Sequence, residues 1–146
     1  MKYFGKRFLS GIFALIMIFS LLCTTASAAV QSSAYLDGYY ASLTADPHGA
    51  MVVSVQVTGV GYMPEIGVKT IYVYESSNGT DFHWVATYDS SGYPKMMGSG
   101  TFFYEDVITH YGTPGLYYYA KAFIYAGNST GGDERVYNTS IKQARY

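Results

Sequence analysis

Histidines and carboxylates are the side chains of this chain that could carry acid–base or metal chemistry. The three histidines are His48, His83 and His110, and no two of them share the i, i+2 or i, i+4 spacing that brings metal ligands together. Glu105-Asp106 and Asp133-Glu134 are adjacent pairs, and neighbours in a strand point to opposite faces of a sheet. The spacing therefore predicts no zinc-type site and no converging pair of catalytic carboxylates.

Motifs for nucleophilic, phosphate and calcium chemistry are equally incomplete. Gly98-Ser-Gly100 lacks the nucleophile-elbow pattern and the strand-to-helix context that such a serine needs. The glycines fall at turn positions instead of forming a phosphate-binding loop. Asp133-Glu134 could join loop carbonyls around a calcium ion, but no Asp-x-Asp-x-Asp pattern accompanies the pair. We expect a protein that is not an enzyme and that uses no metal or cofactor.

Aromatic residues are the remaining side chains that could form a site. The segment 117–126 alternates strictly, as a half-buried β-strand does. Lys121 decides which register faces outward, because a lysine is almost never fully buried. If the apolar residues of the segment 70–74 point inward, Tyr72 and Tyr74 join the same outer face. The predicted ligand-contacting residues on this face are Tyr72, Tyr74, Tyr119, Lys121, Phe123 and Tyr125.

Such an aromatic face has two interpretations. Tyrosine gives a large contact area at a low entropy cost, so the rings could stack on sugars or accept a protein partner. Aromatic residues also suit exposed positions of any sheet. The face is therefore either a binding surface or only a consequence of strand propensity.

The elements that would position these residues are predicted to be strands. Turn-forming residues separate short alternating segments, and no segment has a helical period or cap. Asp46-Pro-His-Gly49 fits a type I turn, Asn78-Gly79 is predicted to be the tight type I′ turn between the third and fourth strands, and 89–100 is predicted to be a loop. The expected strands are 39–44, 51–57, 70–74, 82–88, 101–109, 117–126 and 135–141. The expected core residues are Val53, Val55, Val57, Ile71, Val73, Ala120, Ala122, Ile124 and Ala126.

Seven short strands with turns between them are typical of an immunoglobulin-like β-sandwich, so the predicted fold class is all-β. A resemblance points the same way. Pro114-Gly115, followed by Tyr118-x-Ala-x-Ala-x-Ile-x-Ala126-x-Asn128-Ser-Thr-Gly131, resembles the penultimate strand of fibronectin type III-like domains. In an immunoglobulin-like topology the third strand lies beside the sixth.

A second resemblance covers nearly all of the chain after its first 29 residues. Ile66 to Glu75 reads Ile-Gly-x-Lys-x-Ile-x-Val-Tyr-Glu, and Ala126-x-Asn-Ser-Thr-Gly131 follows late in the chain. The combination resembles an uncharacterised family of small secreted proteins of Gram-positive bacteria, which have a signal peptide and one such domain. The resemblance implies a bacterial origin and the same fold, and it transfers no catalytic residue.

The start of the chain is typical of a secretory signal peptide. Lys2, Lys6 and Arg7 precede an apolar run from Phe8 to Leu22, and Ala26-Ser-Ala28 supplies a small-x-small cleavage site. A membrane anchor is the alternative reading. A spanning helix needs about 20 apolar residues, and this run is shorter and interrupted, which favours cleavage.

Cleavage is expected after Ala28 or Ala29, so that residues 1–29 form the signal peptide and residues 30–146 form one domain of 117 residues. Cys23 is the only cysteine, so the mature domain is expected to be free of disulfides. A lipoprotein anchored through Cys23 is disfavoured, because Leu22 stands where lipoprotein signals have a small residue. The mature product is predicted to be secreted and extracellular.

The charge of the mature domain restricts its partners. Loss of the signal peptide removes three of nine basic residues and none of ten acidic ones, which leaves a net charge of −4. This balance offers no basic footprint for nucleic acid and no attraction to an anionic membrane. We therefore expect a secreted, non-catalytic module that binds an extracellular glycan or protein through the aromatic face. The alternative is a structural or accessory protein that self-associates.

Overall fold

The computed structural model describes residues 33–146, which form nine β-strands, one short 3-10 helix and no α-helix. The predicted signal peptide falls on residues 1–32 and lies outside the described residues. Within 33–146, no helix has the length and hydropathy needed to cross a membrane. The strands are β1 (Leu36–Ala45), β2 (Ala50–Met63), β3 (Glu65–Ser76), β4 (His83–Asp89), β5 (Met97–Gly98), β6 (Thr101–Tyr111), β7 (Tyr117–Asn128), β8 (Gly131–Asn138) and β9 (Lys142–Gln143).

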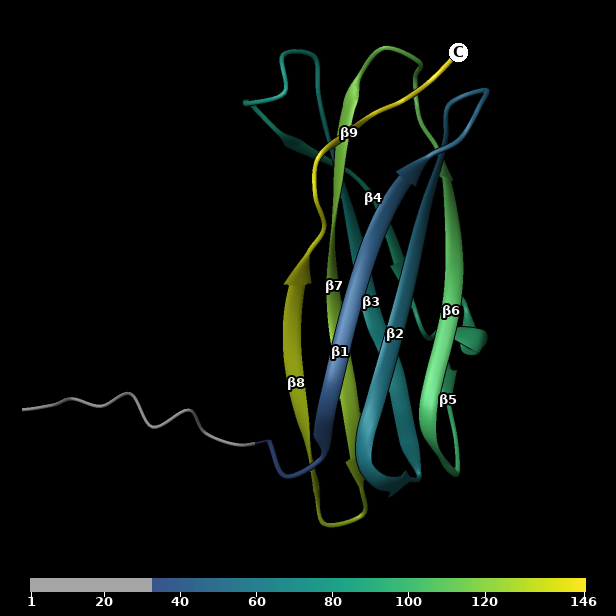
Figure 1. The fold of residues 1–146 in the computed structure, drawn as a ribbon, viewed down its shortest axis with the longest axis vertical. Coiled ribbons are helices and arrows are strands. Elements are labelled where there is room, and N and C mark those ends of the chain that lie inside the picture. The colour runs from purple at the N-terminus through teal and green to yellow at the C-terminus, as the bar shows by residue number, and fades with distance from the viewer. Residues whose placement is uncertain (1–32) are drawn as a thin grey trace, which may run out of the picture. The chain divides into compact units, whose positions relative to one another are not determined.

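The strands form two antiparallel sheets that face each other as a β-sandwich (Figure 1). One sheet has the order β1-β2-β6 and the other the order β4-β3-β7-β8. The two-residue strands β5 and β9 pair with β3 and β7. The predicted all-β sandwich is confirmed, and the seven expected strands correspond to the seven longer strands of the structure.

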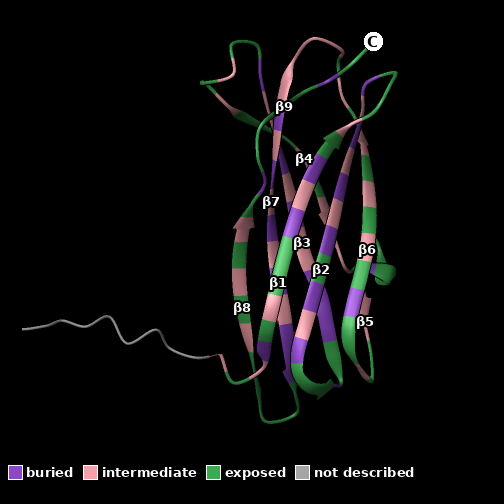
Figure 2. Ribbon diagram, in the orientation of Figure 1, coloured by how far each residue is buried: buried purple, intermediate pink, exposed green. Residues whose placement is uncertain are grey.

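Period-two alternation of apolar residues explains why these segments are strands with one buried face. In β2, Met51, Val53, Val55 and Val57 are buried, while the residues between them are at least partly exposed. Figure 2 shows the same banding along β2 and β7. All nine core residues expected from the sequence are buried.

Strand β7 lies at the centre of the larger sheet, between β3 and β8. Its inward row runs from Tyr118 to Ala126 and is fully buried. Lys121 lies in the opposite row, so the register inferred from this lysine is correct. The prediction that the third strand lies beside the sixth is also confirmed, because β3 pairs with β7 along its whole length.

The connection between β3 and β4 corrects the predicted type I′ turn. A type I′ turn needs positive φ at both central residues, but Gly79 has φ of 75° and Asn78 does not have a positive φ. The connection is instead a six-residue loop over 77–82. Its shape comes from the Asn78 side-chain oxygen, which accepts hydrogen bonds of 2.9 Å from the backbone N–H groups of Thr80 and Asp81.

The segment 89–100 is only partly the loop that the sequence predicts. Pro94–Met96 forms the 3-10 helix, and β5 follows it. Met96 is buried in the core at 1 % exposure, and the backbone oxygen of Lys95 accepts a hydrogen bond of 2.7 Å from the Tyr104 hydroxyl. Burial of a single apolar side chain anchors this segment, and an isolated methionine gives no periodic signal in the sequence.

Candidate functional site

The outer face of the β4-β3-β7-β8 sheet carries all six residues that the sequence predicts as ligand contacts. Cross-strand pairing places Tyr74 opposite Tyr119, and Tyr72 opposite Lys121. Phe123 and Tyr125 continue the outward row of β7. The sheet therefore brings the predicted residues together, and we call Tyr72, Tyr74, Tyr119, Lys121, Phe123 and Tyr125 the aromatic face.

The rings of the aromatic face contact one another in cross-strand pairs. Tyr74 and Tyr119 are stacked, with ring centroids 4.8 Å apart and planes within 2° of parallel. Tyr72 and Phe123 meet edge to face at 5.4 Å. Pairs of this kind contribute about 0.5–1.5 kcal/mol beyond the area that they bury. The mutual contacts explain why these rings are half-buried, whereas the sequence predicts a solvent-facing patch.

Tyr125 occupies the end of the face that lies near the β7–β8 turn. The ammonium of Lys69 lies 3.6 Å from the centroid of its ring and 3.8 Å from the Glu134 carboxylate. The Tyr125 hydroxyl covers the backbone of Gly127 and Gly132, where an added Cβ would come within 2.3 Å of the hydroxyl oxygen. Two glycines and a lysine thus hold this ring in one orientation.

A groove of about 420 Å³ opens at the other end of the aromatic face, between the 77–82 loop and the segment that follows β8. Its walls include the rings of Phe82 and Tyr119, which meet edge to face at 4.9 Å. Lys121, which follows Tyr119 in the outward row of β7, also lines the groove, together with Asn138 and Ile141. The volume lies within the roughly 300–1,000 Å³ of small-molecule sites, so this end of the face has room for a small ligand.

Phe82 is the site residue that sequence reasoning missed. It ends the 77–82 loop, and its position over Tyr119 depends on the path of that loop. Burial against the surrounding groups also raises the pKa of the Tyr119 hydroxyl, with the neighbouring Tyr74 acting in the same direction. A tyrosine hydroxyl is protonated at neutral pH with its ordinary pKa already, so this one can donate a hydrogen bond to a ligand.

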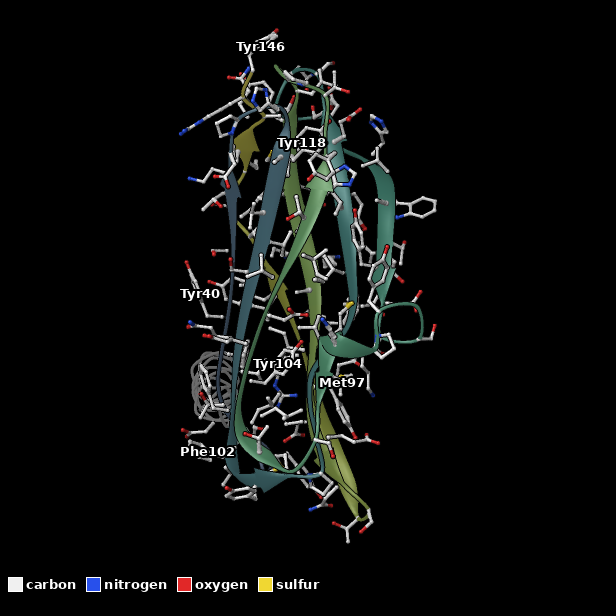
Figure 3. The ribbon with its side chains drawn as sticks, turned by 90° about the vertical axis from the view of Figure 1, so that its right-hand side faces the viewer. Tyr40, Met97, Phe102, Tyr104, Tyr118 and Tyr146 are labelled. Carbon is white, nitrogen blue, oxygen red and sulfur yellow. The ribbon has the colours of Figure 1, made fainter. Side chains whose placement is uncertain are left out.

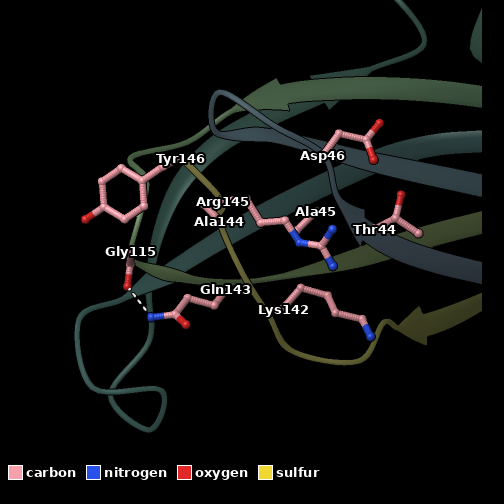
Figure 4. Close-up of a pocket in the computed structure, with 9 residues that line it drawn as sticks. All are labelled: Thr44, Ala45, Asp46, Gly115, Lys142, Gln143, Ala144, Arg145 and Tyr146. Atoms are coloured by element: carbon pink, nitrogen blue, oxygen red, sulfur yellow. Dashed lines mark hydrogen bonds between the residues drawn. The ribbon is translucent and has the colours of Figure 1, made fainter.

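A second concave region of about 690 Å³ lies beside the segment that contains β9 (Figure 4). Charged side chains from opposing segments line it, namely Asp46, Lys142 and Arg145. The Gln143 amide is held there by a 2.8 Å hydrogen bond to the backbone oxygen of Gly115. No residue of the aromatic face lines this region, and it lacks the paired rings of the groove.

A cluster of titratable groups lies inside the sandwich around Tyr118, which Figure 3 places between the two sheets. The Tyr118 hydroxyl donates a hydrogen bond to the Glu75 carboxylate and accepts one of 2.8 Å from the backbone N–H of Thr113. Burial raises the pKa of Tyr118, and the bond to Glu75 raises it further. The His110 ring leans on Tyr118 at 5.7 Å between centroids, and its Nδ1 lies 3.1 Å from the Tyr88 hydroxyl.

The remaining histidines and the Asp133-Glu134 pair contact groups at different places in the sandwich. His83 approaches Glu75 at 3.7 Å. His48 lies in the β1–β2 turn with φ of 60°, so the type I turn predicted for Asp46-Pro-His-Gly49, which needs a negative φ at this residue, is wrong. Asp133 accepts hydrogen bonds from the Ser33 hydroxyl and from the backbone N–H of Tyr35, which ties β8 to the start of β1. Within residues 33–146, no three His, Asp or Glu side chains converge as metal ligands would.

No protein-family model matches the chain, and no curated protein matches it either.

Proposed function

We propose that this chain is a non-catalytic binding domain that holds its ligand in the groove at the Tyr119 end of the aromatic face. The observation that carries the proposal is the placement of two aromatic rings, Phe82 and Tyr119, on one wall of a groove of suitable size. Polar groups of Lys121 and Asn138 also line the groove. Apolar walls with a few convergent polar groups are the usual composition of ligand sites.

The chemistry of the groove supports binding and not turnover. Its described lining contains one lysine, one tyrosine, one asparagine and two threonines, but no carboxylate and no histidine. General acid–base catalysis uses histidine most often, and the titratable groups among these lining residues are the Tyr119 hydroxyl and the Lys121 ammonium. The ligand is therefore expected to leave the groove unchanged.

A glycan is the ligand class that these groups fit best. An aromatic ring can receive the apolar face of a sugar, while amide, hydroxyl and ammonium groups hydrogen-bond its hydroxyls. A flat protein partner would instead need a surface of about 800 Å² on each side, much more than the groove itself offers. A protein ligand would consequently have to cover the whole aromatic face.

We further propose that the domain is of the fibronectin type III or immunoglobulin type. The strand orders β1-β2-β6 and β3-β7-β8 match the A-B-E and C-F-G orders of those sandwiches. The hydrogen bond from the Thr113 backbone to the Tyr118 hydroxyl has the form of their tyrosine corner, near the start of the strand that follows the change of sheet. Together with the signal-like N-terminal sequence, these features support an exported extracellular domain.

Replacement of Phe82 by serine tests the binding function. Phe82→Ser removes an aromatic side chain of the groove but no core residue, so the fold should persist. Affinity for a glycan that binds the wild-type protein should fall by about tenfold or more, because aromatic anchors carry most of the energy of such contacts. Screening on a glycan array followed by titration calorimetry would measure the effect.

Phe102→Ser is the matched control for this experiment. Phe102 is exposed and meets Tyr62 edge to face at 6.0 Å, and Figure 3 places it toward the other end of the sandwich. Its replacement should leave glycan affinity unchanged. Absence of glycan binding by the wild-type protein, or equal loss in both variants, would refute the proposal.

Self-association is a second candidate function, favoured by strand β6. Among the described strands, β6 pairs only with β2, so its other edge is open over eleven residues. Phe103, Val107 and Tyr111 are exposed along it, and open edges of this kind pair with other chains. Sedimentation velocity over a range of concentrations separates the candidates: a binding domain stays monomeric, whereas a self-associating protein sediments faster as its concentration rises.

A further inference from the structure

We propose that the groove is selective for acidic carbohydrates and that Lys121 receives the carboxylate of the sugar. This inference rests on the proposed binding function of the groove and names the chemical class of its ligand. Its basis is the surroundings of Lys121, the only charged residue among those of 33–146 that line the groove.

Lys121 is half-buried among neutral side chains. Tyr72 lies opposite it on β3, and Asn138 lies opposite it on β8. Tyr119 and Phe123 flank it in the outward row of its own strand. Within residues 33–146, no carboxylate oxygen lies within 4.0 Å of its ammonium nitrogen.

Lys69, the other lysine on this sheet face, has an anionic partner. Lys69 contacts the Glu134 carboxylate at 3.8 Å and the Tyr125 ring at 3.6 Å, and it is half-buried like Lys121. Of these two lysines, Lys121 is thus the one without an anionic partner, in a chain that has more acidic than basic residues. A ligand that supplies a carboxylate can therefore form a charge-assisted hydrogen bond that the protein itself leaves unmade.

The rest of the groove is compatible with an anionic ligand. Its lining contains no aspartate or glutamate that would repel a carboxylate. The rings of Phe82 and Tyr119 can hold the sugar ring, while Asn138 can hydrogen-bond its hydroxyls. Attraction to Lys121 would weaken with added salt, because the groove is open to solvent and salt screens exposed charges.

Three pairs of probes test this selectivity: tetragalacturonate, tetramannuronate and a hyaluronan tetrasaccharide, each as the free acid and as the methyl ester. Esterification removes the charge and keeps the sugar. At least one acid should bind the protein about fivefold or more tightly than its ester, as expected for a charge-assisted hydrogen bond, and the difference should shrink at high salt. Titration calorimetry provides the affinities.

Three variants assign the effect to the groove. Lys121→Met should bind acid and ester equally, whereas Lys121→Arg should keep the preference because it keeps the charge. Lys69→Met is the matched control, since Lys69 lies on the same sheet face but does not line the groove, and it should also keep the preference. Urea unfolding of each variant checks that the fold is intact.

Two results would overturn the inference while leaving the proposed function standing: equal affinities for acid and ester in the wild-type protein, or an unchanged preference in Lys121→Met. Failure of all six probes to bind would also overturn it. In that case the Phe82→Ser experiment on the wider glycan array decides the proposed function independently.

Discussion

At the scale of single residues, Tyr119 shows how a position on a sheet can serve the fold and a site together. Its ring stacks on Tyr74 and meets Phe82, so cross-strand packing holds it in place before any ligand arrives. A side chain fixed in this way loses little conformational freedom on binding. The same packing leaves only part of the ring exposed, which is why a ligand must approach through the groove.

A prediction at the residue scale concerns His110. Burial lowers the pKa of His110 below its ordinary value of 6.5, and the nearby Glu75 carboxylate opposes the shift only in part. The unfolded chain then binds a proton at His110 more readily than the folded protein does. The contribution of this histidine to stability is therefore fully present above about pH 6.5, and it is lost as the pH falls through the lower pKa that His110 has in the folded protein. Urea midpoints should therefore decrease between pH 7.5 and pH 5.

Two variants isolate the contribution of His110. His110→Gln should show a smaller loss of stability over the same pH interval, because the titrating group is gone. His48→Asn serves as the control, since His48 is an exposed turn residue with positive φ, which asparagine tolerates. If the wild-type protein and His110→Gln lose stability equally on acidification, the buried neutral histidine is not the cause.

At the scale of elements, the sequence predicts the strands and their buried faces, because these depend on alternation. It does not predict a loop whose path depends on hydrogen bonds from a side chain to the backbone. The inward rows of β2 and β7 follow from residue types alone, and Lys121 sets the register of β7. The prediction of a tight turn at Asn78-Gly79 is wrong, because hydrogen bonds to the Asn78 side chain organise a wider loop. Phe82 belongs to that loop, so the groove was as unpredictable as the loop itself.

Gly79 offers a direct test of the 77–82 loop. Its φ of 75° lies in the left-handed region, which costs a residue with a side chain about 1–2 kcal/mol. Gly79→Ala should therefore destabilise the protein by about that amount in urea unfolding. Gly61→Ala is the control, because φ is not positive there and an added Cβ meets no atom within 4 Å; it should shift stability by less than about 0.5 kcal/mol. Equal destabilisation by Gly79→Ala and Gly61→Ala would show that backbone strain at position 79 is not the cause.

At the scale of the described domain, the two sheets present different outer surfaces. The β4-β3-β7-β8 sheet carries the aromatic face and the groove, while the β1-β2-β6 sheet carries an open edge with scattered exposed apolar residues. Interior packing could be inferred from periodic patterns, and the pairing of β3 with β7 from the expected immunoglobulin-like topology. The cluster of Tyr118, Glu75 and His110 could not, because it joins residues from three strands whose contact only the folded arrangement creates.

The central claim, that the groove is where this domain binds, is tested most directly by NMR. Amide resonances of the ¹⁵N-labelled protein would be recorded during titration with a glycan that the array selects. The account predicts that the largest shift changes fall on residues 79–82, 119–121 and 138–141, which line the groove or adjoin its walls. Changes concentrated on β1, β2 and β6, or beside Asp46 and Arg145, would place binding elsewhere and contradict it.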